Sequence, residues 1–184
     1  METEETRTVS RGGMEAYFWL QAIVWALVVI VLVFTFFGRI IAVEGSSMVP
    51  TLQEGDRLLL QSVGYTPEAG DVVVLTKESF LTTPIVKRVI ATGGQTVEID
   101  YENSCVRVDG VTLNETYINE LMTQPSWDES AVIQVPEGCV FVMGDNRNHS
   151  ADSRDERLGC VDDQLILGHA VLILSPFSHF GRIP

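Results

Sequence analysis

Ser47 and Lys87 are the residues of this sequence whose types and surroundings could carry out covalent catalysis. A serine hydroxyl is a weak nucleophile near neutral pH and needs a base within hydrogen-bonding distance. A lysine amine that lies among apolar side chains loses hydration, which lowers its pKa and favours the neutral form that can accept a proton. We therefore predict Ser47 as a nucleophile and Lys87 as its general base.

The loop that carries Ser47 reads V-E-G-S-S-M-V-P-T-L, from Val43 to Leu52. Gly45 allows the backbone to approach closely and Pro50 fixes the exit of the turn, so the hydroxyl could be presented with the Ser47 N–H free. By itself a Gly-Ser-Ser turn is more often an ordinary loop. The catalytic interpretation therefore depends on finding a base.

Lys87 lies in the run P-I-V-K-R-V-I, from Pro84 to Ile90. Side chains alternate across a strand, so Lys87 and Arg88 lie on opposite faces, and at least one of these cations must sit among apolar neighbours. Arg88 cannot be the base, because a guanidinium stays protonated. The alternative for Lys87 is a position on an edge strand, with its stem packed and its amine in water.

The segment G-D-N-R-N-H-S-A-D-S-R, from Gly144 to Arg154, is the third element of the predicted site. Asp, Asn and Ser side chains bond to nearby backbone groups, so a turn rich in them makes a rigid scaffold. We expect Ser150 to orient the Lys87 amine, and Asp152 with Arg154 to form a supporting ion pair.

The sequence contains no recognisable metal-binding pattern. As a calcium loop, the same segment would place Asp145, Arg147 and His149 at its first, third and fifth positions, and only the first is a hard oxygen ligand. The three cysteines have neither zinc-like nor C-x-x-C spacing, and their pairing stays open. We expect no metal and no cofactor. The cysteines are Cys105, Cys139 and Cys160.

One segment long enough to span a membrane precedes these motifs. Residues 16–37 are 22 predominantly apolar residues, and as a helix they would extend about 33 Å, enough for a bilayer core of about 30 Å. The segment is longer than the apolar core of a cleavable signal peptide and ends in F-F-G-R, which favours a retained anchor. A buried helix of a soluble core is the alternative.

The charges around this anchor suggest its orientation. Two arginines precede it and Arg39 follows it, a weak bias toward a cytoplasmic N-terminus. We predict a single-pass protein of the cell membrane, with a polar cytoplasmic tail (1–15), a transmembrane helix (16–37) and an extracytoplasmic domain (38–184). The formal net charge of −13 argues against a nucleic-acid partner.

Strand-like runs separated by turn residues recur after the Ser47 loop, which predicts a mainly β domain, an antiparallel barrel or sandwich. Asp109-Gly110 is a two-residue hairpin turn between two of these runs. Residues 114–129 show no clear period and are expected to form a surface excursion. The predicted strands are Arg57–Val63, Asp71–Thr76, Ile85–Thr92, Thr96–Asp100, Val106–Val108, Val111–Leu113, Ala131–Val135, Val140–Met143 and Ala170–Leu174.

Taken together, the motifs resemble the conserved boxes of bacterial type I signal peptidases, the leader peptidases that use a Ser/Lys dyad. The matching stretches are S-M-x-P from Ser47, K-R from Lys87 with a following Gly-Gly turn, and G-D-N-R-x-x-S-x-D-S-R from Gly144. The resemblance runs from about Val43 to the end of the chain. It is closest to the single-anchor Gram-positive form, because Gly45 stands where Gram-negative members have a serine.

The resemblance implies a role for each matching residue. Ser47 would be the nucleophile and Lys87 the general base, and the Ser47 N–H would form part of an oxyanion hole beside Gly45. Ser150 would orient the lysine, while Asp145, Asp152 and Arg154 would support the site. Shallow pockets for alanine-sized side chains would be lined by Val43, Met48, Leu52, Ile85 and Val86.

The resemblance also implies the reaction and its substrates. Secretory preproteins would be cleaved after a small-x-small sequence, through an acyl-enzyme, by an enzyme held beside membrane lipid. Relatives in the endoplasmic reticulum use histidine in place of lysine, so His149 is a competing base. The other functions considered are a self-cleaving Ser/Lys regulator, which would need its own scissile loop, and a non-catalytic membrane-anchored β-domain. In such a β-domain Ser47 and Lys87 could lie far apart.

Overall fold

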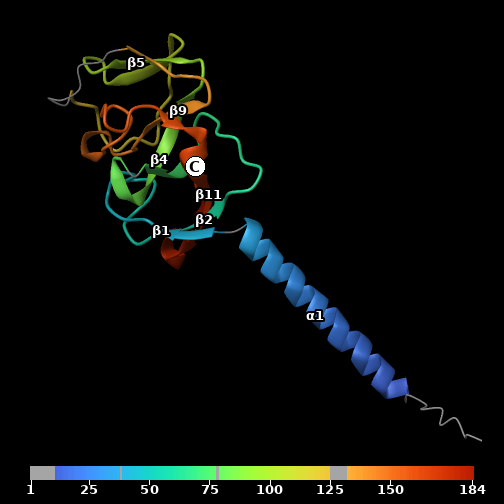
Figure 1. The fold of residues 1–184 in the computed structure, drawn as a ribbon. Coiled ribbons are helices and arrows are strands. Elements are labelled where there is room, and N and C mark those ends of the chain that lie inside the picture. The colour runs from blue at the N-terminus through green and yellow to red at the C-terminus, as the bar shows by residue number, and fades with distance from the viewer. Residues whose placement is uncertain (1–10, 38, 78, 125–131) are drawn as a thin grey trace, which may run out of the picture. The chain divides into compact units, whose positions relative to one another are not determined.

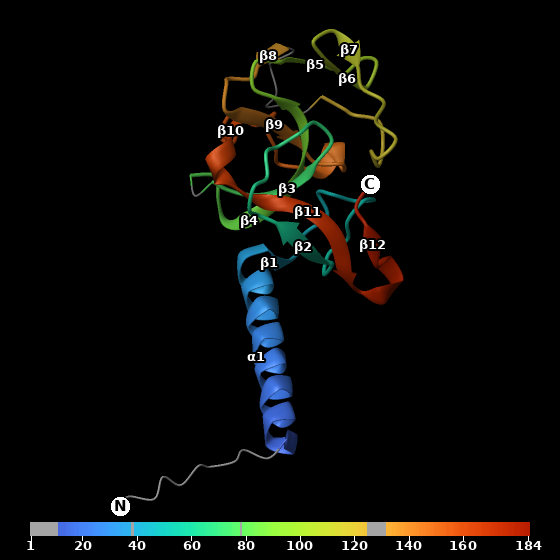
Figure 2. The ribbon, with the colours of Figure 1, turned by 90° about the vertical axis from the view of Figure 1, so that its right-hand side faces the viewer.

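In the computed structural model, residues 11–37, 39–77, 79–124 and 132–184 are described. The chain forms two compact units, Met1–Phe37 and Gly38–Pro184. Figures 1 and 2 show a single long helix in the first unit and strands throughout the second.

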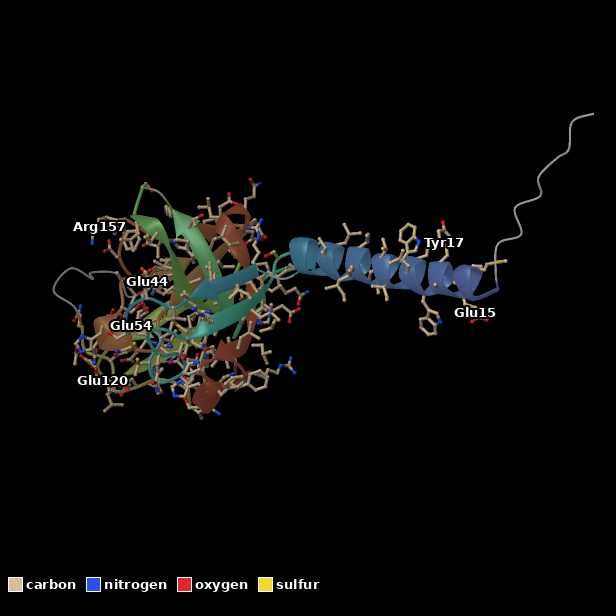
Figure 3. The ribbon with its side chains drawn as sticks, turned by 90° about the horizontal axis from the view of Figure 1, so that it is seen from below. Glu15, Tyr17, Glu44, Glu54, Glu120 and Arg157 are labelled. Atoms are coloured by element: carbon tan, nitrogen blue, oxygen red, sulfur yellow. The ribbon has the colours of Figure 1, made fainter. Side chains whose placement is uncertain are left out.

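The first unit contains the helix α1, Arg11–Phe37. Residues 11–15, predicted to belong to the polar tail, are helical as well, because extending an established helix costs little per residue. Gly13–Leu32 is long and apolar enough to cross a membrane. Its side chains project on all sides (Figure 3) and are exposed, so the unit itself provides no core to cover them. Residues 1–10 of the predicted tail lie outside the described residues.

The second unit is built from two antiparallel sheets, which confirms the mainly β prediction. The larger has the strand order β1-β2-β11-β3-β4-β9-β10, with β12 also paired to β11, and the smaller has the order β7-β6-β5-β8. The strands are β1 Arg39–Ala42, β2 Arg57–Gln61, β3 Val72–Lys77, β4 Leu81–Thr92, β5 Thr96–Asp100, β6 Cys105–Val108, β7 Val111–Thr112, β8 Val132–Gln134, β9 Cys139–Met143, β10 Val161–Asp162, β11 Ile166–Ser175 and β12 Gly181–Arg182.

Each predicted run corresponds to a strand, but β1, β10 and β12 were missed. These strands have only two to four residues, too few to show a period by themselves, and unlike β6 and β7 they do not flank a recognisable hairpin turn. Strand β4 begins at Leu81 rather than at Ile85, although Pro84 lies inside it. The pairing with β3 is irregular there, since Leu75 faces Ile85 whereas Lys77 faces Leu81. A bulge of this kind tolerates a proline that cannot donate to the ladder.

The Asp109-Gly110 turn joins β6 to β7 as predicted. Val108 pairs with Val111, and both turn residues have positive φ, 51° and 78°, as a type I′ hairpin requires.

The core beneath the Ser47 loop anchors that loop to the larger sheet. Met48 and Leu52 are 1% and 0% exposed, and they pack in one cluster with Leu58 and Leu60 of β2 and Val74 of β3. Burying a side chain of this size contributes about 1.5–3 kcal/mol. The apolar residues that follow Ser47 therefore hold the loop in place.

Candidate active site

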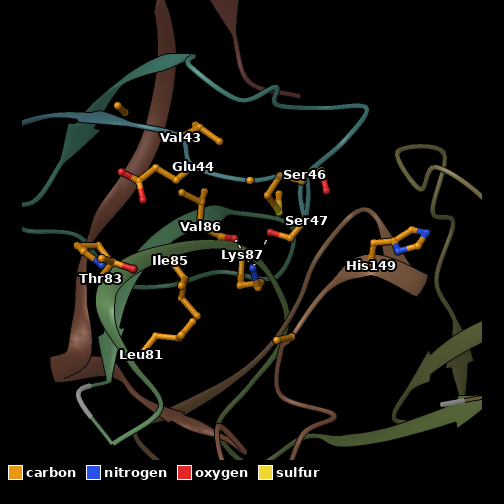
Figure 4. A pocket seen from close by; sticks show the side chains of 15 residues that line it. Val43, Glu44, Ser46, Ser47, Leu81, Thr83, Ile85, Val86, Lys87 and His149 are labelled. Atoms are coloured by element: carbon orange, nitrogen blue, oxygen red, sulfur yellow. Dashed lines mark hydrogen bonds between the residues drawn. The ribbon is translucent and has the colours of Figure 1, made fainter. Parts of the chain in front are cut away.

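The side chains of Ser47 and Lys87 meet in a cleft (Figure 4). The Lys87 Nζ lies 2.8 Å from Ser47 Oγ and donates a second hydrogen bond, of 2.9 Å, to the carbonyl oxygen of Val86. Lys87 is 3% exposed. Strand β4 thus brings the predicted base to the predicted nucleophile across 40 residues of sequence.

Burial changes the proton affinity of Lys87. Loss of hydration lowers the pKa of its amine to about 8, against the opposing effects of the Asp152 and Asp145 carboxylates, while the Arg154 charge also lowers it. A lysine with the ordinary pKa of about 10.4 remains almost fully protonated when the pH equals this lowered pKa. A substantial fraction of Lys87 is therefore neutral in mildly alkaline solution and able to accept a proton.

The Ser47 loop leaves backbone donors free beside the nucleophile. Its turn is closed by hydrogen bonds from Val49 N to Ser46 O (3.2 Å) and from Leu52 N to Met48 O (2.9 Å). Neither the Ser47 N–H nor the Gly45 N–H donates to an acceptor within the described part of the chain. Gly45 has φ +81° and open space at its α-carbon. These free donors could bind an oxyanion.

Asn146 fixes the direction of the Ser47 peptide group. Its side-chain Nδ2 donates to Ser46 O (3.1 Å), and its backbone N–H donates to Ser47 O (3.0 Å). In a trans peptide the C=O and the following N–H point in opposite directions. The bond to Ser46 O therefore sets where the Ser47 N–H points. Asn146 was not among the predicted site residues.

Asp145 joins the three segments of the site. Its carboxylate accepts hydrogen bonds from the Nε and Nη2 atoms of Arg88, at 2.9 and 2.8 Å, and from the Thr51 hydroxyl. The Arg88 and Asp145 side chains are only 2% and 0% exposed. This bidentate pair ties β4 to the loop that follows β9, while Thr51 ties in the Ser47 loop.

The predicted ion pair of Asp152 and Arg154 is present in the core of the site. Arg154 Nε and Nη2 lie 2.8 and 2.9 Å from the Asp152 carboxylate, which also accepts from the N–H of Gly144. Burial would raise the pKa of Asp152, but hydrogen bonds and charge from Arg154 hold it below its ordinary value. Asp152 therefore stays ionised near the Lys87 amine.

Ser150 has a different contact from the predicted one. Its hydroxyl is buried and lies near the Asp152 carboxylate, whose pKa it helps to lower. Among the described residues the acceptors of the Lys87 amine are Ser47 Oγ and Val86 O. Ser150 also lies against Gly144, where an added β-carbon would clash with the Ser150 hydroxyl and come within 2.5 Å of Ser47 O. The glycine thus allows Ser150 to pack beside the nucleophile loop.

In the described part of the predicted surface excursion, residues 114–124, some side chains pack against the site, while residues 125–129 lie outside the described residues. The carboxylate of Glu115 is 2.5 Å from Arg147 Nη2, with side chains 5% and 0% exposed, and the Tyr117 ring lies 4.1 Å from Arg88 Cζ. Met122 is 3% exposed. These contacts were not predicted, because they are long-range and leave no periodic pattern in the sequence. A buried arginine in the 144–154 segment could have indicated that an acidic partner was needed.

The cleft beside Ser47 and Lys87 has a volume of about 380 Å³. Four of the predicted pocket residues line it, namely Val43, Met48, Ile85 and Val86. Leu52 does not line it, because the turn from Met48 to Leu52 directs this side chain into the core, where it is 0% exposed.

His149 lies on the rim of the cleft rather than at its catalytic end. In Figure 4 its ring points away from Ser47 and Lys87. Its side chain is 70% exposed, and its Nε2 is 4.0 Å from Glu120. The competing base is therefore not aligned with the serine.

Comparison with known proteins identifies a family. The sequence model described as "Signal peptidase, peptidase S26" matches residues 17–175. "Probable signal peptidase I-1" from Synechocystis sp. (strain ATCC 27184 / PCC 6803 / Kazusa) is 40% identical over 168 residues, 86% of this chain and 82% of that protein. Signal peptidase I P from Bacillus subtilis subsp. natto is 37% identical over 169 residues, 87% and 89% of the two chains. Signal peptidase I from Bacillus licheniformis is 32% identical over 189 residues, 98% of each chain.

Proposed function

The chain belongs to the signal peptidase family, peptidase S26, and on that premise we propose that it removes signal peptides from secretory preproteins with Ser47 as nucleophile and Lys87 as general base. The observation that carries the assignment of residues is the 2.8 Å separation of Lys87 Nζ and Ser47 Oγ. An amine with a pKa of about 8 supplies the base that a serine nucleophile needs.

The reaction follows from the geometry of this pair. The neutral Lys87 amine takes the proton of Ser47 as its oxygen attacks the carbonyl carbon of the scissile bond. The Ser47 N–H stabilises the resulting oxyanion, with Gly45 the candidate for a second donor. The Lys87 ammonium then protonates the departing amine and leaves an acyl-enzyme. Water activated by Lys87 hydrolyses that ester and regenerates Ser47.

Asp145, Asp152, Arg154 and Ser150 support the dyad without touching the scissile bond. Asp145 holds β4 through Arg88, while the Asp152 and Arg154 pair, with Ser150 packed beside it, keeps compensated charge near the amine. Asp152 raises the Lys87 pKa and Arg154 lowers it. These groups tune the base and hold it in place.

The cleft fits a small-x-small cleavage site. Val43, Met48, Ile85 and Val86 give it apolar walls, and Met48 and Val86 are themselves buried, which leaves shallow space for alanine-sized side chains. Residues 81–87 of β4 have one edge that pairs with no described strand. An extended substrate could add to that edge through backbone hydrogen bonds.

The membrane supplies proximity between enzyme and substrate. The protein is membrane-associated, with α1 as its anchor, and we propose a cytoplasmic N-terminus and an extracytoplasmic domain in the cell membrane. Nine residues separate Phe37 from Ser47, so the nucleophile is within about 33 Å of the end of the helix. A preprotein held in the same bilayer by its apolar segment presents its cleavage site in the same layer.

A non-catalytic β-domain is disfavoured because it would not need a buried amine beside a serine hydroxyl. A self-cleaving regulator would use the same pair, but it would cut its own chain. Both alternatives predict that a separate preprotein stays intact.

Intact-mass spectrometry tests the proposed function. Full-length enzyme in detergent is incubated with a preprotein that carries Ala-x-Ala before its mature sequence. We expect one cut, directly after the second alanine. An uncut preprotein, or cuts scattered elsewhere, would refute signal-peptide removal.

The pH dependence of cleavage tests Lys87 as the base. Only the neutral amine can take the Ser47 proton. We therefore expect kcat/KM to rise about tenfold per pH unit at acidic pH and to level off above the Lys87 pKa of about 8. A base with the ordinary lysine pKa would give a continued rise toward about 10.4, whereas a histidine would give a plateau above about 6.5. Either of those profiles, measured with a peptide that does not titrate in this range, would contradict the assignment.

A further inference from the structure

The cleft continues along β4 well beyond the catalytic pair. From Ser47 and Lys87 the side chains of Ile85, Thr83 and Leu81 continue along one side of it, away from His149 (Figure 4). Leu81 is 43% exposed. A leucine that is half exposed in a cleft continuous with the catalytic centre can bury further apolar surface only when something binds there.

Strand β4 sets the length of this wall. One edge of β4 is occupied by β3, from the Leu81 and Lys77 pair to the Lys87 and Val73 pair. On the other edge, β9 begins to pair only at Arg88. Six residues at about 3.3 Å each give at most about 20 Å between the α-carbons of Leu81 and Lys87. An extended peptide added to the free edge has the same rise and would span five or six residues over this distance.

Contacts at the tip of the β3-β4 hairpin hold Leu81 in place. The Lys77 amine donates to Leu158 O, and the Phe80 N–H donates to Lys77 O at 2.8 Å. The Arg157 guanidinium lies 5.7 Å from the centre of the Phe80 ring. The wall that ends at Leu81 is therefore attached to residues 157–158 rather than free in solution.

We propose that Leu81 forms a distal subsite for an apolar side chain of the signal peptide, five or six residues before the scissile bond. The inference rests on the proposed function. The side chain that contacts Leu81 is placed before the scissile bond because the apolar segment of a signal peptide precedes its small-residue cleavage site. Leucine is the complementary wall for such a segment, and Thr83 between Leu81 and Ile85 makes the middle of the wall more polar.

A leucine scan of the substrate tests this subsite. Peptides that end in Ala-x-Ala before the scissile bond carry one leucine at the fourth, fifth, sixth, seventh or eighth position upstream, in a serine-rich background. For each enzyme the measured quantity is kcat/KM of the leucine peptide divided by that of the leucine-free peptide. With full-length wild-type enzyme in detergent, we expect this ratio to reach about five to ten at the fifth or sixth position.

Substitution of Leu81 should remove that preference. In Leu81→Ala and in Leu81→Thr, which places a β-branched residue of high strand propensity at this position, the ratio should fall to about one. The matched control is Val111→Ala, an exposed apolar residue on the smaller sheet, which should keep the wild-type ratio. Thermal melting of each variant tests whether β4 remains folded.

The outcomes separate this inference from the function on which it rests. If wild-type enzyme cleaves no peptide of the series, the proposed function fails. If it cleaves them but leucine has no preferred position, or if the preference persists in both Leu81 variants, only the subsite is refuted. A preference confined to the fourth, seventh or eighth position upstream would also overturn it.

Discussion

Replacing Lys87 by methionine is expected to lower kcat/KM for preprotein cleavage by at least about a thousandfold, because the variant keeps the buried aliphatic stem but has no atom that can take the Ser47 proton. Ser47→Ala should cause a loss of the same order, since it removes the attacking oxygen. The two losses should not multiply in the double variant, because the residues act as one unit. Initial rates of cleavage, followed by mass spectrometry, measure all three variants.

The matched control for this experiment is His149→Ala. His149 lies on the rim with its side chain 70% exposed, so we expect its removal to change kcat/KM by less than about threefold. The opposite pattern, in which cleavage survives Lys87→Met but not His149→Ala, would transfer the role of the base to the histidine. Thermal melting must show that Lys87→Met remains folded, and an apolar side chain at this buried position is expected to satisfy that condition.

The dyad could be predicted from the sequence because each of its members has a local signature. Ser47 is followed by Met48, which anchors the loop, and Lys87 lies within a run of β-branched residues. Both patterns can be recognised in the sequence without knowing which strands are neighbours. What brings the two side chains to 2.8 Å is the pairing of strands distant in sequence, and only the family resemblance indicated that.

The groups that position the dyad could not be predicted in the same way. Asn146 acts through Ser46 O, and Glu115 acts through Arg147. An asparagine in a turn or a glutamate after a hairpin has many possible partners, so residue type and spacing do not identify one. Leu52 illustrates a related difficulty, because an apolar residue near a nucleophile can face the cleft or the core, and its burial at 0% exposure shows that it packs in the core.

The longer strands were easier to predict than the short strands and the ends of strands. Each strand with five or more residues was recognised, because each lies in a run rich in apolar or β-branched residues. Strand β1 has four residues and follows directly after the apolar segment, so its pattern merges with that of the anchor. The N-terminal part of β4 was missed because Pro84 is disfavoured in a ladder. That part carries Leu81 and Thr83, so the error hid one wall of the cleft.

Loss of Asp145 is expected to destabilise the second unit more than any other single substitution considered. Asp145→Ala would remove the carboxylate that pairs with the Arg88 guanidinium, whose side chain is only 2% exposed. An uncompensated buried charge costs about 3–5 kcal/mol of unfolding free energy. For a domain of this size we expect a fall in melting temperature of about 10 °C. Thermal unfolding of the full chain in detergent, followed by near-ultraviolet circular dichroism, measures the change.

Two further variants separate the buried charge from general damage to the loop. The double variant Arg88→Met, Asp145→Leu removes both charges, and because an apolar pair of similar size avoids the desolvation penalty, much of the lost stability should return. Arg157→Ala breaks an ion pair whose arginine is 78% exposed, and the melting temperature should not change measurably. Arg88 Nη1 also donates to the carbonyl oxygens of Gly70 and Pro184. If Asp145→Ala melted like wild type, these hydrogen bonds would have to be enough to stabilise the buried guanidinium, and the proposed link from β4 through Asp145 to the Ser47 loop would carry no stability.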